Sequence, residues 1–239
     1  MRVRARHKEW VVRRIGIFSG TFDPVHIGHL RAAEACLSFM GLDKVLFVPF
    51  GRPLIRQAEA GAAHRAAMIR LTIAKSPGLE LSELDLGPKP RYAVDTVRAV
   101  RKLHPDAQLV YIVGADKLAD IPSWKEAAAL FQLCAFAAFP RAGYDAAALC
   151  EALREQGADI TLVPSGLITM SSGQIRAQLR LLSDATGKLL PQVAEYIASR
   201  GLYQPDYESM LRRSVLPGRL DHSLGVRETA VHLARLHHL

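Results

Sequence analysis

The sequence has few cysteines, and their spacing suits neither a disulfide framework nor a metal site. Only three occur in 239 residues, namely Cys36, Cys134 and Cys150, and no two of them form a CxxC pair. An odd number of separated thiols within apolar segments argues against a small secreted domain held together by disulfides. We therefore expect buried free thiols, a reducing compartment and a cytoplasmic location.

Long hydrophobic runs are also missing. No apolar stretch approaches the roughly 18 residues that a membrane-spanning helix needs. The N-terminal stretch MRVRARHKEWVVRR lacks the apolar centre of a secretory signal peptide. We expect no membrane partner.

Excess positive charge is absent from the body of the chain. The formal net charge is +8, but residues 1–14 alone hold six basic residues against one Glu. Residues 206–239 are close to neutral, with five Arg against four acids. A nucleic-acid footprint should lie on the folded body rather than on a terminal arm. We therefore interpret residues 1–13 as a basic N-terminal arm and expect no nucleic-acid partner.

The remaining composition is that of a folded protein, with 49% hydrophobic and 23% charged residues. Short β-branched or aromatic runs alternate with segments of helical period. Strands are predicted at 14–18, 44–49, 79–84, 107–113, 134–139 and 159–163. Helices are predicted at 28–40, 63–75, 94–104, 116–131, 145–156, 172–183 and 189–200.

This alternation predicts an α/β fold, a doubly wound Rossmann-like parallel sheet with helices on both faces. The predicted domain covers 14–205, and a short helical C-terminal appendage follows at 206–239. In such sheets ligands bind outside the carboxyl ends of the strands, near the switch point of the strand order. Segment 51–62 is the longest connection without a pattern, and either a lid over a ligand or a surface excursion without a role would explain it.

The chemistry-bearing residues follow the first predicted strand. The segment fits neither the GxGxxG dinucleotide fingerprint nor a Walker loop. It offers instead a turn of small residues and then His26, Gly28 and His29, where a helix begins. Backbone donors at a helix start attract phosphate, a glycine permits close approach, and the two imidazoles can donate to the same group of oxygens. This arrangement suits a polyphosphate.

The residues GTFDPVHIGH at 20–29 resemble the HxGH signature of the nucleotidyltransferase superfamily, and MSSGQIR at 170–176 resembles its ISSTxIR segment. Within the superfamily, residues 15–203 are most similar to the nicotinate mononucleotide adenylyltransferases. Four further segments carry this narrower resemblance: HRAAM at 64–68, YAVDT at 92–96, VGAD at 113–116 followed by SWKE at 123–126, and RAGY at 141–144. Their order and spacing make the resemblance specific.

The resemblance implies transfer of AMP from ATP to nicotinate mononucleotide, giving deamido-NAD and pyrophosphate. It implies His26, His29 and Arg176 as catalytic residues on the ATP phosphates. The implied ATP-binding residues are Phe18, Ser19, Gly20, Thr21, Gly28, Gly114, Asp116, Arg141, Ser171 and Ser172. The implied mononucleotide-binding residues are Tyr92, Asp95, Thr96, Trp124 and Arg56.

The resemblance also bears on Trp124 and on the metal ion. An indole offers a flat face to a pyridine ring, although Trp124 could equally be a core residue. Magnesium is expected with ATP, held mainly by phosphates and water, and we assign neither Asp23 nor Asp116 as a protein ligand.

Three positions depart from the family pattern. Ile55 stands where a lid lysine is expected, Ala93 replaces a threonine, and Gly173 replaces the threonine of the SST sequence. These departures leave open an impaired nucleotide-binding module. The closest rival enzyme is a pantetheine-phosphate adenylyltransferase, against which the 92–96 and 114–124 segments argue. The preference between nicotinate and nicotinamide mononucleotide and the oligomeric state are not determined by the sequence.

The C-terminal segment RLDHSLGVRETAVHLARLHHL resembles the beginning of an HD-type phosphohydrolase domain, in which His222 would be the first metal ligand. Such a site needs a His-Asp pair further along, but Asp221 is the last aspartate of the chain. The segment is therefore interpreted as a truncated or vestigial appendage, or as a docking helix unrelated to metals.

Overall fold

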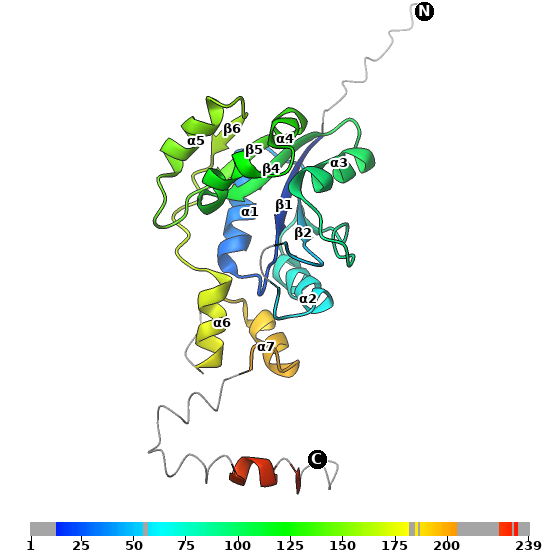
Figure 1. Ribbon diagram of the computed structural model, residues 1–239, viewed down its shortest axis with the longest axis vertical. Helices are drawn as coiled ribbons and strands as arrows, with labels where there is room; N and C mark the ends of the chain where they lie inside the picture. Colours follow the sequence, from blue (N-terminus) through cyan, green and yellow to red (C-terminus); the bar gives the residue numbers. More distant parts are fainter. Residues whose placement is uncertain are drawn as a thin grey trace, which may run out of the picture.

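A six-stranded parallel sheet forms the centre of the protein (Figure 1). The computed structural model describes residues 13–54, 57–181, 185, 187–204, 225–230 and 232–233. The strands lie in the order β3-β2-β1-β4-β5-β6, and every neighbouring pair is parallel. They are β1 (Arg14–Gly20), β2 (Lys44–Pro49), β3 (Leu79–Leu81), β4 (Gln108–Gly114), β5 (Ala135–Phe139) and β6 (Ile160–Leu162). The doubly wound α/β prediction is confirmed, and the order reverses between β1 and β4.

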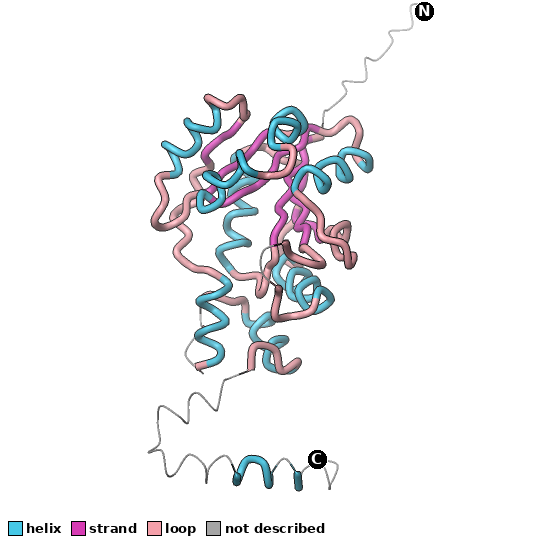
Figure 2. Tube along the Cα trace, in the orientation of Figure 1, coloured by secondary structure: helices cyan, strands magenta, loops and turns pink. Residues whose placement is uncertain are grey.

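Helices cover both faces of the sheet (Figure 2). They are α1 (Ile27–Phe39), α2 (Ala62–Ile73), α3 (Ala93–Leu103), the 3-10 helix η1 (Ala115–Ser123), α4 (Ala127–Leu133), α5 (Ala146–Arg154), α6 (Ser172–Arg180) and α7 (Pro191–Ser199). One hydrophobic cluster joins the sheet to α1, α2, α6 and α7, and the other joins it to α3, η1, α4 and α5. Figure 1 shows α6 and α7 beyond one end of the sheet, where α7 packs against α2.

Strand β2 illustrates why this sequence forms a sheet buried on both sides. Successive side chains of a strand point to opposite faces. Val45 and Phe47 belong to the cluster with α1 and α2, whereas Leu46 and Val48 belong to the cluster with α3. A continuous apolar run therefore supplies both layers at once.

The prediction of one helix over 116–131 was wrong. The structure has η1, a break in which Glu126 has a positive φ of 53°, and then α4. Pro122 lies in this stretch, and proline lacks the backbone N–H that a continuing helix would need. Strand β3 is also shorter than predicted, because the chain turns away after Ser82 donates its last sheet-like bond to Phe47.

Several predictions fall outside the described residues. These are the arm up to residue 12, the positions Ile55 and Arg56, and most of the C-terminal segment with His222. Residues 225–230 and 232–233 are helical. Among the residues that the structure describes, no helix has both the length and the apolar character to cross a membrane.

Candidate active site

The two histidines of the HxGH segment form a closed pair at the beginning of α1. The backbone N–H of His26 donates to Nδ1 of His29 at 3.2 Å, and that of His29 donates to Nδ1 of His26 at 3.3 Å. Their rings stack with centroids 3.7 Å apart. Two backbone donors that a helix start leaves unpaired are thereby satisfied, so the pair caps the helix that carries it.

The capping bonds fix the hydrogen-bonding role of both rings. Because each Nδ1 accepts a backbone N–H, the proton of each neutral imidazole resides on Nε2. Burial, and then the charge of Arg141, lower the pKa of His26 to about 3. Burial, followed by the neighbouring His26 and Arg141, also lowers the pKa of His29 well below its ordinary value. At neutral pH the pair therefore presents two uncharged Nε2–H donors.

A cavity of about 220 Å³ opens in front of this pair. It lies at the carboxyl ends of β1 and β5 and beside η1, where the reversal of strand order places a ligand site. Its lining residues come from five separate segments of the chain. They are Phe18, Ser19, Gly20, Phe22, His26, Gly28, His29, Asp116, Lys117, Phe139, Arg141, Ile168, Ser171 and Ser172.

The cavity contains charged groups of both signs. The guanidinium Nε of Arg141 lies 3.4 Å from a carboxylate oxygen of Asp116, and Nζ of Lys117 lies 3.9 Å from the other oxygen. The hydroxyl of Ser19 is buried and has no hydrogen-bond partner among the described residues. Cations and the N–H donors of the histidine pair therefore line the same space, as binding of a polyphosphate requires.

Helix α6 brings the second predicted phosphate segment to the cavity. Ser171 caps the helix by accepting the backbone N–H of Gln174, and the hydroxyl of Ser172 donates to the carbonyl of Pro24 at 2.8 Å. That bond docks the beginning of α6 against the turn that precedes His26. Two segments almost 150 residues apart thus meet at one cavity.

Arg176, the third predicted catalytic residue, does not line the cavity. Its Nε donates to Glu59 at 2.7 Å, and its Nη1 donates to the carbonyl of Asp23 at 2.6 Å. Glu59 also accepts a bond from Arg180. The carboxylate of Glu59, which the sequence patterns did not single out, holds Arg176 there together with Asp23, whose carboxylate oxygen lies 3.7 Å from Nη1.

Asp23 and Arg65 organise the loops around the cavity, and neither was among the predicted site residues. Asp23 is buried and accepts N–H groups of Glu59 and Ala60 at 2.8 and 3.0 Å and the hydroxyl of Tyr203 at 2.7 Å. Arg65 is also buried and donates to four carbonyl groups, those of Thr21, Phe50, Gly51 and Ala60. An arginine amid apolar residues of HRAAM was the available signal for such a role.

The glycines of the site permit close contacts. A Cβ on Gly28 would lie 2.9 Å from both Nδ1 of His26 and a methyl group of Ile168. A Cβ on Gly114, which ends β4, would lie 2.4 Å from a carboxylate oxygen of Asp116. Thr21 contributes its carbonyl to Arg65, and neither Thr21 nor Gly114 lines the cavity.

Apart from Arg56, which lies outside the described residues, the residues predicted for the mononucleotide belong to α3, the residue before it, and the end of η1. Nζ of Lys125, the residue after Trp124, lies 4.8 Å from the ring centre of Tyr92 and 3.4 Å from the carboxylate of Asp95. These contacts connect the beginning of α3 to the end of η1. The indole of Trp124 meets the Tyr111 ring edge-on at a centroid distance of 6.0 Å. Thr96 points inward and donates to buried Asp85.

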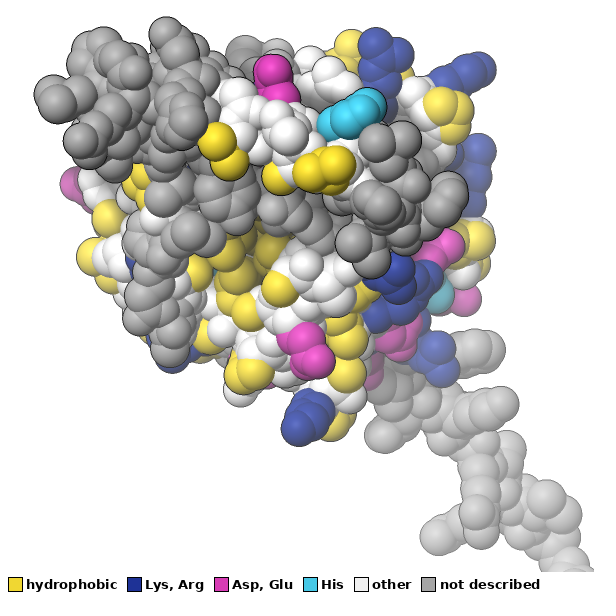
Figure 3. Space-filling view, turned by 90° about the horizontal axis from the view of Figure 1, so that it is seen from below, with side chains coloured by type: hydrophobic (Ala, Val, Ile, Leu, Met, Phe, Trp, Pro, Cys, Tyr) yellow, Lys and Arg dark blue, Asp and Glu magenta, His cyan; other side chains and the backbone are white. Residues whose placement is uncertain are grey.

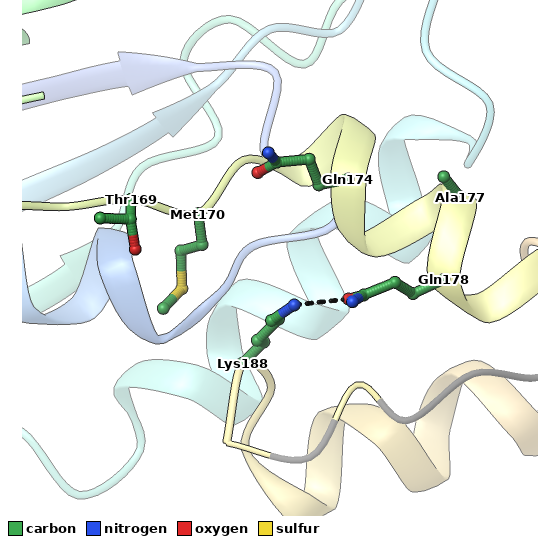
Figure 4. Close-up of a pocket in the computed structure, with 6 residues that line it drawn as sticks. All are labelled: Thr169, Met170, Gln174, Ala177, Gln178 and Lys188. Carbon is green, nitrogen blue, oxygen red and sulfur yellow. Dashed lines mark hydrogen bonds between the residues drawn. The ribbon is translucent and has the colours of Figure 1, made fainter. Parts of the chain in front are cut away.

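Another cavity, of about 350 Å³, lies beside α6 and contains neither histidine (Figure 4). In it, Nζ of Lys188 donates to Oε1 of Gln178 at 2.8 Å. Figure 3 shows one outer face, on which basic and acidic side chains of the described residues lie next to each other. The expectation of no nucleic-acid partner stays a prediction.

The sequence and the fold are similar to those of known nucleotide-transferring enzymes. The family described as cytidylyltransferase-like matches residues 17–178. A probable nicotinate-nucleotide adenylyltransferase of Gloeobacter violaceus is 40% identical over 197 residues, covering 80% of this chain and 96% of the relative. The chain belongs to the nicotinate-nucleotide adenylyltransferase family. Its counterpart in Symbiobacterium thermophilum is 38% identical over 198 residues, with 80% and 95% coverage.

Solved structures agree with this family membership at the level of the fold. The nicotinic acid mononucleotide adenylyltransferase of Plasmodium falciparum, complexed with NaAD, superposes with a TM-score of 0.70 at 21% identity. The match covers 80% of this chain and 97% of that one. The same Plasmodium enzyme complexed with APC gives a TM-score of 0.67. Membership in this family, rather than in the pantetheine-phosphate branch, confirms the resemblance carried by the 92–96 and 113–126 segments.

Proposed function

We propose that this protein transfers the adenylyl group of ATP to nicotinate mononucleotide, forming deamido-NAD and releasing pyrophosphate. The observation that carries the proposal is the convergence of the histidine pair, the two serines of α6 and the Asp116–Arg141 pair on one cavity. A second group of residues around Tyr92 and Trp124 is available for the mononucleotide. The curated relatives, of whose length this chain covers 95–96%, are named for this reaction.

The reaction needs no protein nucleophile. An anionic phosphate oxygen of the mononucleotide forms a bond to the α-phosphorus of ATP, while the bond from that phosphorus to the bridging oxygen of pyrophosphate breaks. The protein must hold two anions in line and stabilise the charge that develops on the α-phosphate and the leaving group. Positioning of this kind contributes roughly 7–11 kcal/mol in favourable intramolecular comparisons.

The histidines contribute as hydrogen-bond donors rather than as fixed cations. Their Nε2–H groups are free of the capping bonds, and both rings are neutral at physiological pH. Donors held in place before the reaction cost no reorganisation when charge develops on the phosphate oxygens. Positive charge comes from Arg141 and Lys117, which line the same cavity.

Magnesium is the cation that we propose to accompany ATP. No group of three or more His, Cys, Asp or Glu suited to a metal occurs in the described part of the chain, whereas the carboxylate of Asp116 lines the cavity. One carboxylate together with phosphate oxygens and water fits the coordination that Mg²⁺ prefers. When bound, the ion would neutralise phosphate charge and favour departure of pyrophosphate. Asp23 does not fit this role, because its oxygens are buried and hydrogen-bonded.

The test supplies purified protein with ATP, magnesium and either nicotinate or nicotinamide mononucleotide, and measures pyrophosphate and the dinucleotide. We expect stoichiometric release of both products with the nicotinate substrate. ATP binding without turnover of either mononucleotide would contradict the proposal and favour an inactive nucleotide-binding module. The reaction is proposed for the cytoplasm, in keeping with the free, buried state of Cys36, Cys134 and Cys150.

A further inference from the structure

The carboxylate of Glu59 forms an ion pair with Arg176, the arginine expected to bind the ATP phosphates. The two oxygens of Glu59 accept bonds from Arg176 and Arg180, two residues four positions apart on α6. The side chain of Arg176 is mostly buried, with 22% of its surface exposed, and that of Glu59 is 34% exposed. The pair is therefore partly shielded from water and lies outside the cavity lining.

Arg176 nevertheless lies within reach of the cavity. Ser172 lines the cavity and precedes Arg176 by four residues, so the two share one face of α6 about 6 Å apart along its axis. An extended arginine side chain covers a similar distance. A change of side-chain conformation that releases both Glu59 and the carbonyl of Asp23, to which Nη1 donates at 2.6 Å, can thus carry the guanidinium to a phosphate in the cavity.

Glu59 has contacts that would hold it in position after Arg176 leaves its carboxylate. Its backbone N–H donates to Asp23 at 2.8 Å, and this bond does not involve the side chain. Arg180 contacts the other carboxylate oxygen and can keep neutralising it. Carboxylates and phosphates both engage the guanidinium fork through paired charge-assisted bonds, so one anion can replace the other.

We propose that Glu59 is an affinity-setting residue that substitutes for the ATP phosphates on Arg176 in the free protein, and that ATP binding exchanges the two anions. This inference rests on the proposed function. Glu59 touches no substrate and acts only through Arg176. ATP must displace it, so the carboxylate lowers the affinity for ATP while keeping the guanidinium paired in the free state.

If Glu59 competes with ATP for Arg176, removal of the Glu59 charge should increase the affinity for ATP. Partly exposed ion pairs of this kind are weak, so Glu59→Gln should lower the Kd for ATP about two- to fivefold. Glu59→Ala, which also removes the hydrogen bond, should lower it at least as much. Adenosine has no phosphates, and its affinity should not change. Loss of a merely structural contact would not tighten binding.

The experiment is titration calorimetry of ATP and of adenosine against the wild type and both Glu59 variants, at fixed magnesium. Glu151→Gln is the control for removal of a paired carboxylate away from the cavity, because Glu151 forms a more exposed ion pair with Arg154 at 2.8 Å on α5. The gain should shrink between about 0.1 M and about 1 M salt, where the Debye length falls from ~10 to ~3 Å. Unchanged or weaker ATP binding by both Glu59 variants, or an equal gain with Glu151→Gln, would overturn the inference.

Turnover of the wild type is measured on the same preparations. Dinucleotide formation by the wild type together with unchanged ATP affinity of the variants would reject the role of Glu59 alone. Failure of the wild type to form the dinucleotide would reject the proposed function, on which the inference depends.

Discussion

His26 and His29 each accept the other's backbone N–H through Nδ1, at distances of 3.3 and 3.2 Å. The reciprocal arrangement has two consequences from one geometry. It caps α1, and it turns both Nε2–H groups into the free donors of the pair. Replacement of either histidine therefore removes both a helix cap and a donor to the cavity.

Replacement of His29 should affect turnover far more than binding of the mononucleotide. His29→Ala removes an Nε2–H donor from the cavity, and loss of one preorganised donor of this kind typically lowers kcat about 10²- to 10³-fold. The KM for nicotinate mononucleotide should stay within about twofold, since the residues around Tyr92 are untouched. Steady-state kinetics provides the check, with His64→Gln as a control outside the cavity. Equal losses in kcat and mononucleotide affinity, or none, would argue against the proposed donor role.

Acid should destabilise the fold through the same pair. Folding holds the pKa of His26 near 3 and that of His29 well below its ordinary value, against 6.5 in the unfolded chain. Below pH 6.5 the histidines of the unfolded chain therefore bind protons that the folded protein does not bind, and the free energy of unfolding decreases as the pH is lowered. At pH 5 the loss from His26 is about 2 kcal/mol, and His29 adds a loss of the same sign.

Urea unfolding between pH 7 and pH 5 measures this slope before most carboxylates titrate. A double variant, His26→Asn with His29→Asn, should lose most of the slope because asparagine does not titrate. If the double variant keeps the wild-type slope, the source of the acid sensitivity lies elsewhere.

The fold could be predicted because its signals are local and repeated. Each strand is a short apolar run and most helices carry an amphipathic period, so the order of elements and the parallel sheet follow directly. The prediction for the segment after β4 was wrong for an equally local reason. Its apolar period suggested one helix, whereas Pro122 and the positive φ of Glu126 divide it into η1 and α4.

The site was only partly predictable, because several of its contacts join residues far apart in sequence. The histidines, the serines of α6, Asp116 and Arg141 stand in recognisable motifs and do meet at the cavity. Glu59 stands in a segment without any pattern, and its pairing with Arg176 depends on how α6 docks. Asp23 likewise acquires its partners only when residues 59, 60 and 203 come together.

Removal of the Tyr203 hydroxyl should destabilise the protein measurably. Tyr203→Phe takes one of three donors from the buried carboxylate of Asp23, and a hydrogen bond to a charged group contributes about 1.5–3 kcal/mol. Tyr196→Phe is the matched control, since the Tyr196 hydroxyl bonds a ring nitrogen of His64 at 2.9 Å rather than a carboxylate, and its loss should cost about 0.5–1.5 kcal/mol. Denaturant unfolding compares them. A smaller cost for Tyr203→Phe than for the control would refute the assigned importance of Asp23.

Gly173 tests whether the departure from the family's SST sequence weakens ATP binding. A Cβ added at this position would meet only the hydroxyl of Ser171, at 4.0 Å, so a larger side chain fits without rearrangement. Gly173→Ala should stabilise α6 by up to about 0.5–1 kcal/mol, because glycine is the costlier residue in a helix.

Gly173→Thr adds a hydroxyl at the same place, next to two serines that line the cavity. If that hydroxyl reaches a phosphate, a hydrogen bond of about 0.5–1.5 kcal/mol should lower the Kd for ATP roughly two- to tenfold relative to Gly173→Ala. Equal ATP affinity of the two variants would show that the missing hydroxyl does not limit ATP binding at this site.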